Sequence, residues 1–189
     1  FTPKSLLRDP RCVSPIEDFT HGAFQETFDD VTVNKADVKT LVFCTGKFYY
    51  DITAEREILG RNDVAVVRIE QLFPLPVEQL KAIIAKYPNA DDYVWAQEEP
   101  RNQGAWYYLA PHLFRLIAPP KPATRPTKAY LLEPVARPPS AAPAAGSMQM
   151  HVAQQQKVIN EALGLPKNED STEDKLEAKA EIAEKQATD

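Results

Sequence analysis

The segment Cys44–Lys47 is the part of the sequence that comes closest to a phosphate-binding loop, because an apolar run ends there in Gly46-Lys47. A P-loop needs a second glycine five residues before the Gly-Lys pair and a Ser or Thr after it, and this chain has Leu41 and Phe48 at those positions. A nucleotide cradle is therefore not expected. The start of the helix predicted after Gly46 still offers a weak anion site, for which the candidate residues are Gly46, Lys47 and Arg68.

Glu98 and Glu99 are adjacent carboxylates, the group that general acid–base catalysis most often needs in pairs. Neighbouring side chains of a strand or an extended loop point apart, so we expect a solvated or interface loop rather than a catalytic pair. His112 falls on a predicted helix among leucines, which is typical of the edge of a core. With six glycines and no nucleophile-elbow pattern in the chain, we predict no catalytic residue and no cofactor-binding residue in this segment.

The cysteines and histidines do not predict a metal site. Cys12 and Cys44 lack zinc-ligand spacing, and the histidines at 21, 112 and 151 are far apart in the sequence. Cys44 lies in an apolar run and is expected to be a small buried side chain, whereas Cys12 lies in a polar loop. No secretory signal pattern precedes them, so we expect both thiols to be reduced.

The composition is that of an ordinary globular protein, with 189 residues of which 43% are apolar and 26% charged. Such a chain can build one core of roughly 130–160 residues. No apolar run reaches the roughly 18–20 residues of a membrane span, so no membrane segment is expected. The net charge of -5 argues against a nucleic-acid partner, which would require a basic face.

Buried strands alternate with amphipathic helices from residue 40 onward. Short apolar runs predict strands at 41–44, 64–69 and 93–96, with a possible fourth at 128–132, and helical spacing predicts helices at 50–59, 77–87 and about 105–117, the last bent at Pro111. This order implies right-handed crossovers and a mainly parallel sheet covered on both faces, which is an α/β fold. The order of the strands in the sheet does not follow from the sequence.

The flanking segments differ from this α/β domain, which we assign to 39–164. Residues 1–38 read as a docking arm from a missing preceding domain, with a short helix and an aromatic stripe as one possibility. Eight prolines make 118–143 an extended strap over the surface, and Ser147 is expected to cap a last helix at 147–163. The charged tail at 165–189 is expected to be disordered and dispensable for folding.

Several strings occur in an order specific enough to identify a family, and they are Thr2–Arg8, Phe43–Lys47 with Tyr49–Asp51, Val67–Leu72 with Pro74–Pro76, Trp95–Trp106 and Ser140–Gly146. Over residues 1–164 the chain resembles the C-terminal domain of the thiamine-diphosphate-dependent first component of the 2-oxoglutarate dehydrogenase complex. The string Gln97–Trp106 is the most diagnostic. The resemblance implies a three-layer, transketolase C-terminal-like α/β domain, and the chain's start at Phe1 agrees with a piece of a longer protein.

The same resemblance implies a function for the whole enzyme. The family decarboxylates 2-oxoglutarate on thiamine diphosphate and passes the succinyl group to a lipoyl group of the dihydrolipoyl succinyltransferase component. Thiamine diphosphate and Mg²⁺ bind between the two preceding domains, outside this segment, and this domain helps to form the homodimer. The implied location is the cytoplasm of a bacterium, or the mitochondrial matrix of a eukaryote.

The polar stretch that follows the third predicted strand is the candidate interface. A strand ending at Ala96 would deliver it to the carboxyl edge of the sheet, where α/β proteins place functional surfaces. The residues concerned are Gln97, Glu98, Glu99, Arg101, Asn102, Gly104 and Trp106. The alternatives left open are packing within the domain and direct contact with substrate.

Two departures from the family are visible. Actinobacterial relatives bind acetyl-CoA with paired arginines and an upstream Lys-x-x-Ser, whereas this chain has Glu78 and Gln79, and Ala23 and Glu26, at those positions. The carboxylates would repel the coenzyme's phosphates, so this regulation is expected to be absent. Ala136 also stands where many relatives have glycine. The competing hypothesis is a free-standing anion-binding regulatory module, which a start codon directly before Phe1 would favour.

Overall fold

Residues 3–117 and 132–165 are described by the computed structural model of the chain. They contain a five-stranded sheet with the strand order β1-β3-β2-β4-β5. Strand β1 is antiparallel to β3, and all other neighbours are parallel. The strands are β1 Thr27–Phe28, β2 Thr40–Cys44, β3 Val64–Ile69, β4 Asp92–Pro100 and β5 Leu132–Arg137.

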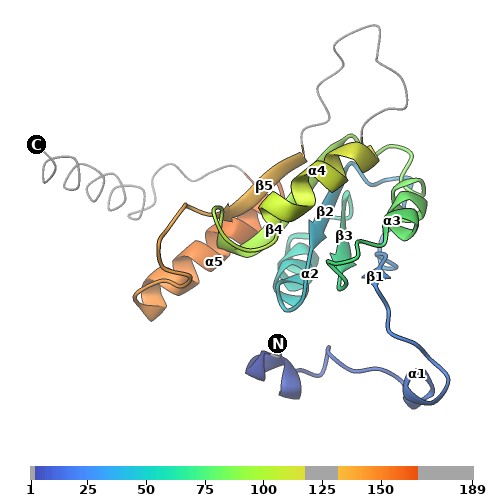
Figure 1. The fold of residues 1–189 in the computed structure, drawn as a ribbon, viewed down its shortest axis with the longest axis horizontal. Coiled ribbons are helices and arrows are strands. Elements are labelled where there is room, and N and C mark those ends of the chain that lie inside the picture. The colour runs from blue at the N-terminus through green and yellow to red at the C-terminus, as the bar shows by residue number, and fades with distance from the viewer. Residues whose placement is uncertain (1–2, 118–131, 166–189) are drawn as a thin grey trace, which may run out of the picture.

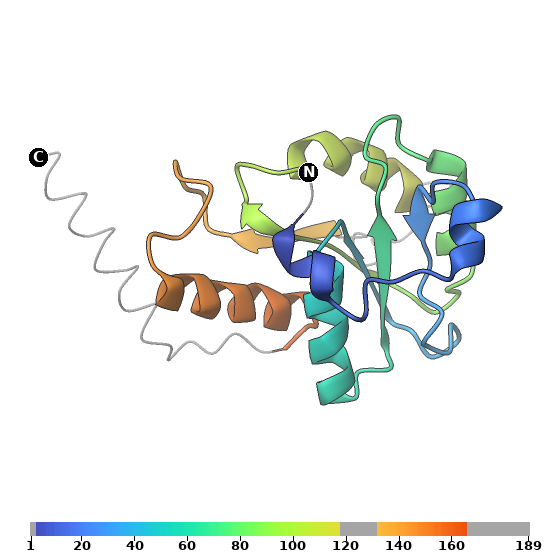
Figure 2. The same ribbon diagram turned by 90° about the horizontal axis from the view of Figure 1, so that it is seen from below.

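The helices cover both faces of this sheet and produce three layers (Figure 1). Helices α3 and α4 lie on one face and α2 and α5 on the other, as the view turned by 90° shows (Figure 2). Their bounds are α2 Phe48–Leu59, α3 Val77–Ile84, α4 Trp106–Ile117 and α5 Met148–Ala162. The predicted three-layer α/β architecture with a mainly parallel sheet is confirmed.

The alternation of side chains along each strand divides the core in two. In β2, Leu41 and Phe43 pack toward α3 and α4, whereas Val42 and Cys44 pack toward α2 and α5. All four are fully buried, which explains why the strand reads as a continuous apolar run. Burial also raises the pKa of the Cys44 thiol above its ordinary value, so this cysteine acts as an apolar side chain. Cys12 is exposed, and neither thiol forms a disulfide.

The helix boundaries follow local signals read from the sequence. Gly60 ends α2 with a φ of 63°, and the Ser147 side chain accepts a hydrogen bond from the Met150 N–H at the start of α5. Pro111 lies inside α4, as expected. Helix α3 ends at Ile84, three residues earlier than predicted, and the chain continues in turns through Tyr87.

Strand β4 is longer than predicted. The expected end at Ala96 is wrong, because the strand runs to Pro100 and pairs there with Arg137 of β5 across a register shift. This extension places Gln97 through Glu99 within β4, beyond the last residue that pairs with β2, instead of in a loop. The polar side chains of this stretch give no sequence signal for a strand. The extension forms because β5, a segment far away in the chain, pairs with it.

The described part of the segment at 1–38, residues 3–38, lies mostly outside the three layers (Figure 1). It contains a short 3-10 helix η1 Lys4–Arg8, a single-turn helix α1 Ile16–Thr20, and the edge strand β1, which was not predicted. Of the three phenylalanines of the possible aromatic stripe, Phe19 and Phe24 are exposed, and Phe28 packs against the guanidinium of Arg68.

Other predictions fall outside the described residues, in whole or in part. These are the first half of the strap at 118–143, the tail beyond Leu165, and the strand at 128–132 apart from Leu132. In the described half of the strap, the expectation of a surface segment is wrong for Leu132–Arg137, because these residues form β5 and pair with β4, which buries Leu132, Val135 and Arg137. Ala136 lies within β5, a conformation that requires no glycine. No helix among residues 3–117 and 132–165 is long and apolar enough to cross a membrane.

Candidate functional site

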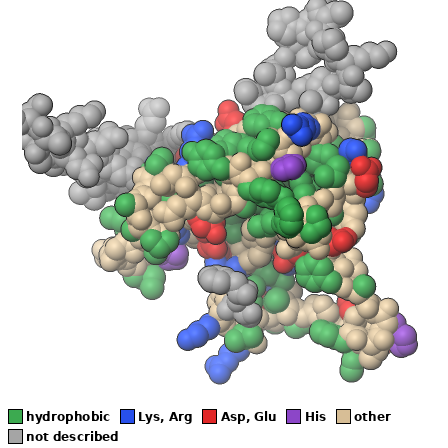
Figure 3. Space-filling view, in the orientation of Figure 1, with side chains coloured by type: hydrophobic (Ala, Val, Ile, Leu, Met, Phe, Trp, Pro, Cys, Tyr) green, Lys and Arg blue, Asp and Glu red, His purple; other side chains and the backbone are tan. Residues whose placement is uncertain are grey.

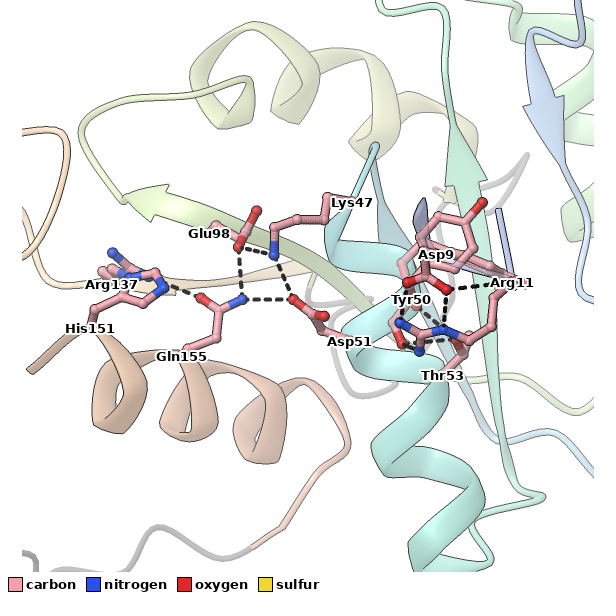
Figure 4. Close-up of polar contacts among 11 residues, drawn as sticks. Asp9, Arg11, Lys47, Tyr50, Asp51, Thr53, Glu98, Arg137, His151 and Gln155 are labelled. Carbon is pink, nitrogen blue, oxygen red and sulfur yellow. Dashed lines mark hydrogen bonds and ion pairs between the residues drawn. The ribbon is translucent and has the colours of Figure 1, made fainter. Parts of the chain in front are cut away.

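The carboxyl edge of the parallel strands collects charged side chains from four elements. Lys47 follows β2, Glu98 lies near the end of β4, and Arg137 ends β5. Helices α2 and α5 add Asp51 and Gln155, and the five side chains form one connected polar network (Figure 4). Parallel pairing places these strand ends at one edge, as α/β folds do with functional surfaces.

Lys47 is the centre of this network. Its Nζ lies 2.7 Å from Asp51 Oδ2 and 2.8 Å from Glu98 Oε1. Burial alone would lower the pKa of Lys47, but the hydrogen bonds to the two carboxylates outweigh burial and raise that pKa above its ordinary value. The ammonium therefore stays charged and already holds two counter-charges, so an external anion would have to displace one of them.

Gly46 and Arg68 are likewise occupied. The Gly46 N–H donates to Glu70 Oε1 at 3.2 Å, and Arg68 Nε lies 3.2 Å from the same oxygen. Arg68 Nη1 also donates to the Tyr50 hydroxyl at 3.0 Å. The three candidates for an anion site thus lie near one another at the carboxyl edge, and each has a partner within the domain.

The guanidinium of Arg68 is enclosed by aromatic rings. Its central carbon lies 4.2 Å from the centre of the Phe28 ring and 4.8 Å from that of Tyr49. Cation–π contacts of this kind stabilise a cation that has lost part of its water. They explain how β1, which contributes Phe28, is held against the sheet.

Gln97, predicted as an interface residue, is directed into the domain. Its side chain is buried, its Oε1 accepts from Trp95 Nε1 at 2.9 Å and from the Trp106 N–H at 3.2 Å, and its Nε2 donates to the carbonyl of Gln103 at 2.8 Å. Gly104 has a φ of 67°, and a Cβ there would lie 2.9 Å from the Gln97 amide. Much of the diagnostic string Gln97–Trp106 therefore serves to connect β4 to α4.

The rest of the candidate interface divides into paired and exposed residues. Asn102 makes two hydrogen bonds to the backbone of Ser140, one donated at 3.0 Å and one accepted at 3.0 Å, which fasten the turn to the segment after β5. Glu98 belongs to the Lys47 network. Glu99 and Arg101 are exposed and make no side-chain hydrogen bond or ion pair to another described residue.

Two buried arginines escaped the sequence reasoning. Arg56 of α2 forms a buried ion pair with Asp30 and donates to the carbonyl of Val64 at 3.1 Å. Arg137 donates from Nη2 to Gln155 Oε1 at 2.9 Å and contacts His151 Nδ1 at 3.0 Å. Arg56 lies in no apolar stretch or motif. Arg137 ends the string that contains Ala136, but only the alanine of that string departs from the family, and nothing in the sequence indicated that the arginine is buried.

Residues at the positions of the actinobacterial acetyl-CoA site meet in space. Gln79 Nε2 donates to the Glu26 carboxylate, and its Oε1 accepts from Thr27 Oγ1 at 3.1 Å. The Gln79 amide thus stands at one of the two positions expected to hold arginine in those relatives, and the Glu26 carboxylate at the position expected to hold serine. This chemistry is unsuited to phosphate groups, which require positive partners.

The chemistry available at the carboxyl edge is ion pairing and hydrogen bonding. Across residues 3–117 and 132–165, no group of three or more His, Cys, Asp or Glu side chains is arranged to hold a metal ion. His112 is half-buried beside Tyr108, with 5.2 Å between ring centres, as expected for the edge of a core.

Comparison with known proteins agrees with this fold. The 2-oxoglutarate dehydrogenase E1 component of Azotobacter vinelandii is 43% identical over 162 residues, which is 85% of this chain and 16% of that protein. The corresponding protein of Haemophilus influenzae is 41% identical over 163 residues, 86% of this chain and 16% of its own length. The mitochondrial 2-oxoglutarate dehydrogenase of Caenorhabditis elegans is 41% identical over 173 residues, 89% of this chain and 16% of its own.

These relatives include bacterial and mitochondrial enzymes, and the chain covers about one sixth of their length. The profile of the family described as 2-oxoglutarate dehydrogenase C-terminal matches residues 13–163, which include every strand and the helices on both faces of the sheet. The chain belongs to the 2-oxoglutarate dehydrogenase C-terminal family.

Proposed function

We propose that this chain is the C-terminal domain of a 2-oxoglutarate dehydrogenase E1 component, and that it builds interfaces rather than performing the chemistry. The whole enzyme would decarboxylate 2-oxoglutarate and transfer the succinyl group to a lipoyl group of the succinyltransferase component. The observation that carries this proposal is the 43% identity to such an enzyme over 85% of the chain. The location would follow the host, in the bacterial cytoplasm or the mitochondrial matrix.

The geometry supports a non-catalytic role for the domain. At the carboxyl edge, Lys47 is bound to Asp51 and Glu98, and Arg68 is bound to Glu70. Groups paired in this way are poor acids, bases or anion receptors, because any reaction must first break a charge-assisted contact. Thiamine diphosphate and Mg²⁺ are accordingly assigned to other domains of the enzyme.

Calorimetric titration tests this division of labour. The 189-residue chain should release no heat of binding with thiamine diphosphate and Mg²⁺, and should not consume 2-oxoglutarate. The enzyme that includes the preceding domains should bind the cofactor and turn over. Micromolar binding by the chain alone would overturn the assignment of the cofactor site to other domains.

The exposed part of the turn after β4 is the proposed contact with another subunit or with the preceding domains. Glu99 and Arg101 support this proposal because they are exposed and available, whereas Gln97 and Asn102 are used inside the domain. Changing Glu99 and Arg101 to alanine in the full-length enzyme should weaken dimerisation, measured by sedimentation, without lowering the melting temperature of the chain. Glu133→Ala, an exposed carboxylate on β5, is the matched control. Unchanged dimer dissociation in the double variant would eliminate this interface.

The segment at 1–38 is the proposed docking arm. Its support is a set of large apolar side chains that are at least 69% exposed, namely Leu7, Val13, Ile16, Phe19 and Phe24. Exposed apolar side chains concentrated in one short segment mark a surface that another protein part covers. Phe19→Ser should lower the melting temperature of the full-length enzyme and leave that of the isolated chain unchanged. Equal effects in both would contradict docking.

The competing function, a free-standing anion-binding regulator, has less support. An effector at Gly46, Lys47 or Arg68 would have to displace Glu70, Asp51 or Glu98. The same calorimeter decides the matter, since a regulator would bind phosphate or a small phosphorylated metabolite to this chain at micromolar concentration.

A further inference from the structure

Arg137 is a buried cation that only neutral groups hold. The residue is 6% exposed, and its Nη2 is used by Gln155 Oε1 at 2.9 Å and His151 Nδ1 at 3.0 Å. Its Nε is buried and has no hydrogen-bond partner. Within the described part of the chain, no carboxylate forms an ion pair with this guanidinium.

The other buried or half-buried arginines that the structure describes are all paired with carboxylates. Arg56 contacts Asp30, Arg61 lies 2.7 Å from Asp63, and Arg68 lies 3.2 Å from Glu70. Removing a cation from water without a counter-charge costs far more than removing a paired one. Among the described residues, three buried or half-buried arginines therefore have a carboxylate partner, and Arg137 has none.

The neighbours of Arg137 restrict what can complete it. Gln155 turns its carbonyl toward Arg137 because its Nε2 donates to Asp51 at 3.1 Å and to Glu98 at 2.8 Å (Figure 4). Arginine can only donate, so in this contact His151 Nδ1 is the acceptor. The carboxylates of Asp51 and Glu98, which are joined to Arg137 through Gln155, would repel a dianion such as phosphate more strongly than a monoanion.

We propose that Arg137, with His151 beside it, is a receptor for one carboxylate group supplied from outside the 189-residue chain. Both hydrogens of Nη2 are used by Gln155 and His151, so the carboxylate would accept a charge-assisted hydrogen bond from the unpartnered Nε. Guanidinium also binds phosphate, but the second charge of a phosphate would be repelled by Asp51 and Glu98, which favours the singly charged carboxylate. The group would come either from an Asp or Glu elsewhere in the assembled enzyme or from a free carboxylate metabolite. It would replace the missing counter-charge and leave the Lys47 network intact.

Sodium acetate is the probe, with sodium chloride at equal ionic strength as the reference. In the 189-residue chain, acetate should shift the ¹⁵N–¹H resonance of Arg137 Nε saturably and leave that of Arg56 Nε unchanged. At about ten times the dissociation constant, acetate should raise the melting temperature by about 4 °C relative to chloride. A shift that grows linearly without saturation, or equal shifts at both arginines, would overturn the proposal.

A second variant, which supplies the carboxylate from within the chain, keeps the test decisive even if Arg137→Met fails to fold. His151→Glu places an acidic group beside the guanidinium and should abolish the response to acetate, as Arg137→Met should. His112→Glu, which changes a half-buried histidine on α4 in the same way, should keep the full response. If His151→Glu responds as the unchanged chain does, the anion binds elsewhere and the proposal is wrong.

The source of the carboxylate is decided with the full-length enzyme, and only this arm rests on the proposed function. If acetate stabilises the 189-residue chain but not the enzyme, another part of the enzyme already supplies the group. If acetate stabilises both, the site takes a free metabolite. Absence of any response in the chain overturns the receptor itself, whatever the enzyme does.

Discussion

Arg56 and Arg137 are two buried arginines on the same side of the sheet with opposite electrostatic environments. Arg56 is 5% exposed and has the Asp30 carboxylate, the Thr32 hydroxyl and a backbone carbonyl around it. Arg137 is 6% exposed and has an amide and an imidazole. Equal burial therefore does not imply an equal role. The first pair is complete within the domain and joins the segment before β2 to α2 and β3, whereas the second has capacity left for a partner.

The largest expected effect comes from breaking the complete pair. Asp30→Ala leaves the Arg56 charge buried without a counter-ion and also removes the acceptor for the Val66 N–H, which donates to Asp30 Oδ2 at 2.9 Å. We expect a loss of about 3–5 kcal/mol in the free energy of unfolding. Urea denaturation followed by circular dichroism measures it.

The control for this variant is a more exposed pair. Asp63→Ala removes the partner of Arg61, whose side chain is 27% exposed, and should cost about 1 kcal/mol or less. If Asp30→Ala costs no more than Asp63→Ala, the buried pair is not the support that its position indicates.

The same pair predicts an acid-sensitive stability. Burial alone would raise the pKa of Asp30, but hydrogen bonds from Thr32 and the Val66 N–H, together with the Arg56 charge, lower that pKa below the ordinary value. A carboxyl with a lowered folded-state pKa contributes stability above its unfolded pKa of about 4 and loses it as the pH falls through the folded value.

Stability should therefore fall as the pH decreases below about 4, the unfolded-state pKa, and Asp30→Asn should flatten this part of the profile. Unfolding free energies from urea titrations at half-unit pH steps measure the difference. An Asn variant that keeps the full acid dependence would assign it to other carboxyls, such as Asp29, whose pKa is also lowered.

A smaller loss of stability is expected at Arg137, which has no carboxylate partner among the described residues. Arg137→Met removes hydrogen bonds to Gln155 and His151 but strands no buried carboxylate in the described part of the chain. We expect a loss of about 0.5–1.5 kcal/mol in the isolated chain, the value of ordinary hydrogen bonds. A loss as large as that of Asp30→Ala, measured by the same urea titrations, would show that Arg137 has a structural role like that of Arg56.

The smallest loss of stability is expected at Lys47, whose ion pairs with Asp51 and Glu98 are half-exposed. Lys47→Met removes a cation from Asp51 and Glu98, but both carboxylates keep the Gln155 amide as a donor and reach water. We expect about 0.5–1 kcal/mol, decreasing in 1 M salt because exposed charges are screened. Thermal melts at two salt concentrations test this, and a salt-independent loss would indicate a packing role for the lysine stem instead.

Exposed hydrophobic side chains are concentrated in two regions of the surface. Hydrophobic side chains gather over the face that carries α4 (Figure 3), where Tyr107 and Phe114 are 67% and 42% exposed. Another set lies along the arm at 1–38. The arm is tied to the body through contacts such as Arg11 Nη1 to the carbonyl of Tyr50, at 3.0 Å.

Local signals in the sequence determined the α/β class, most of the elements and the family. Strands β2 and β3 are apolar runs buried on both faces, and Gly60 and Ser147 mark helix ends through backbone geometry that depends on adjacent residues. The strings around Cys44 and Gln97 identified the 2-oxoglutarate dehydrogenase family, because their residues are tied to one another by burial and by hydrogen bonds. These features need no knowledge of which strand lies beside which.

Only the tertiary structure decided how the polar residues are used. Strand β4 continues to Pro100 because β5 pairs with it, and Gln97 is buried because Trp95, Gln103 and Trp106 converge on its amide. Arg137 meets His151 and Gln155 because α5 packs beside β5. A polar side chain carries no periodic signal of burial, and its role depends on hydrogen-bond partners brought from distant parts of the chain, so the fold must form before that role exists.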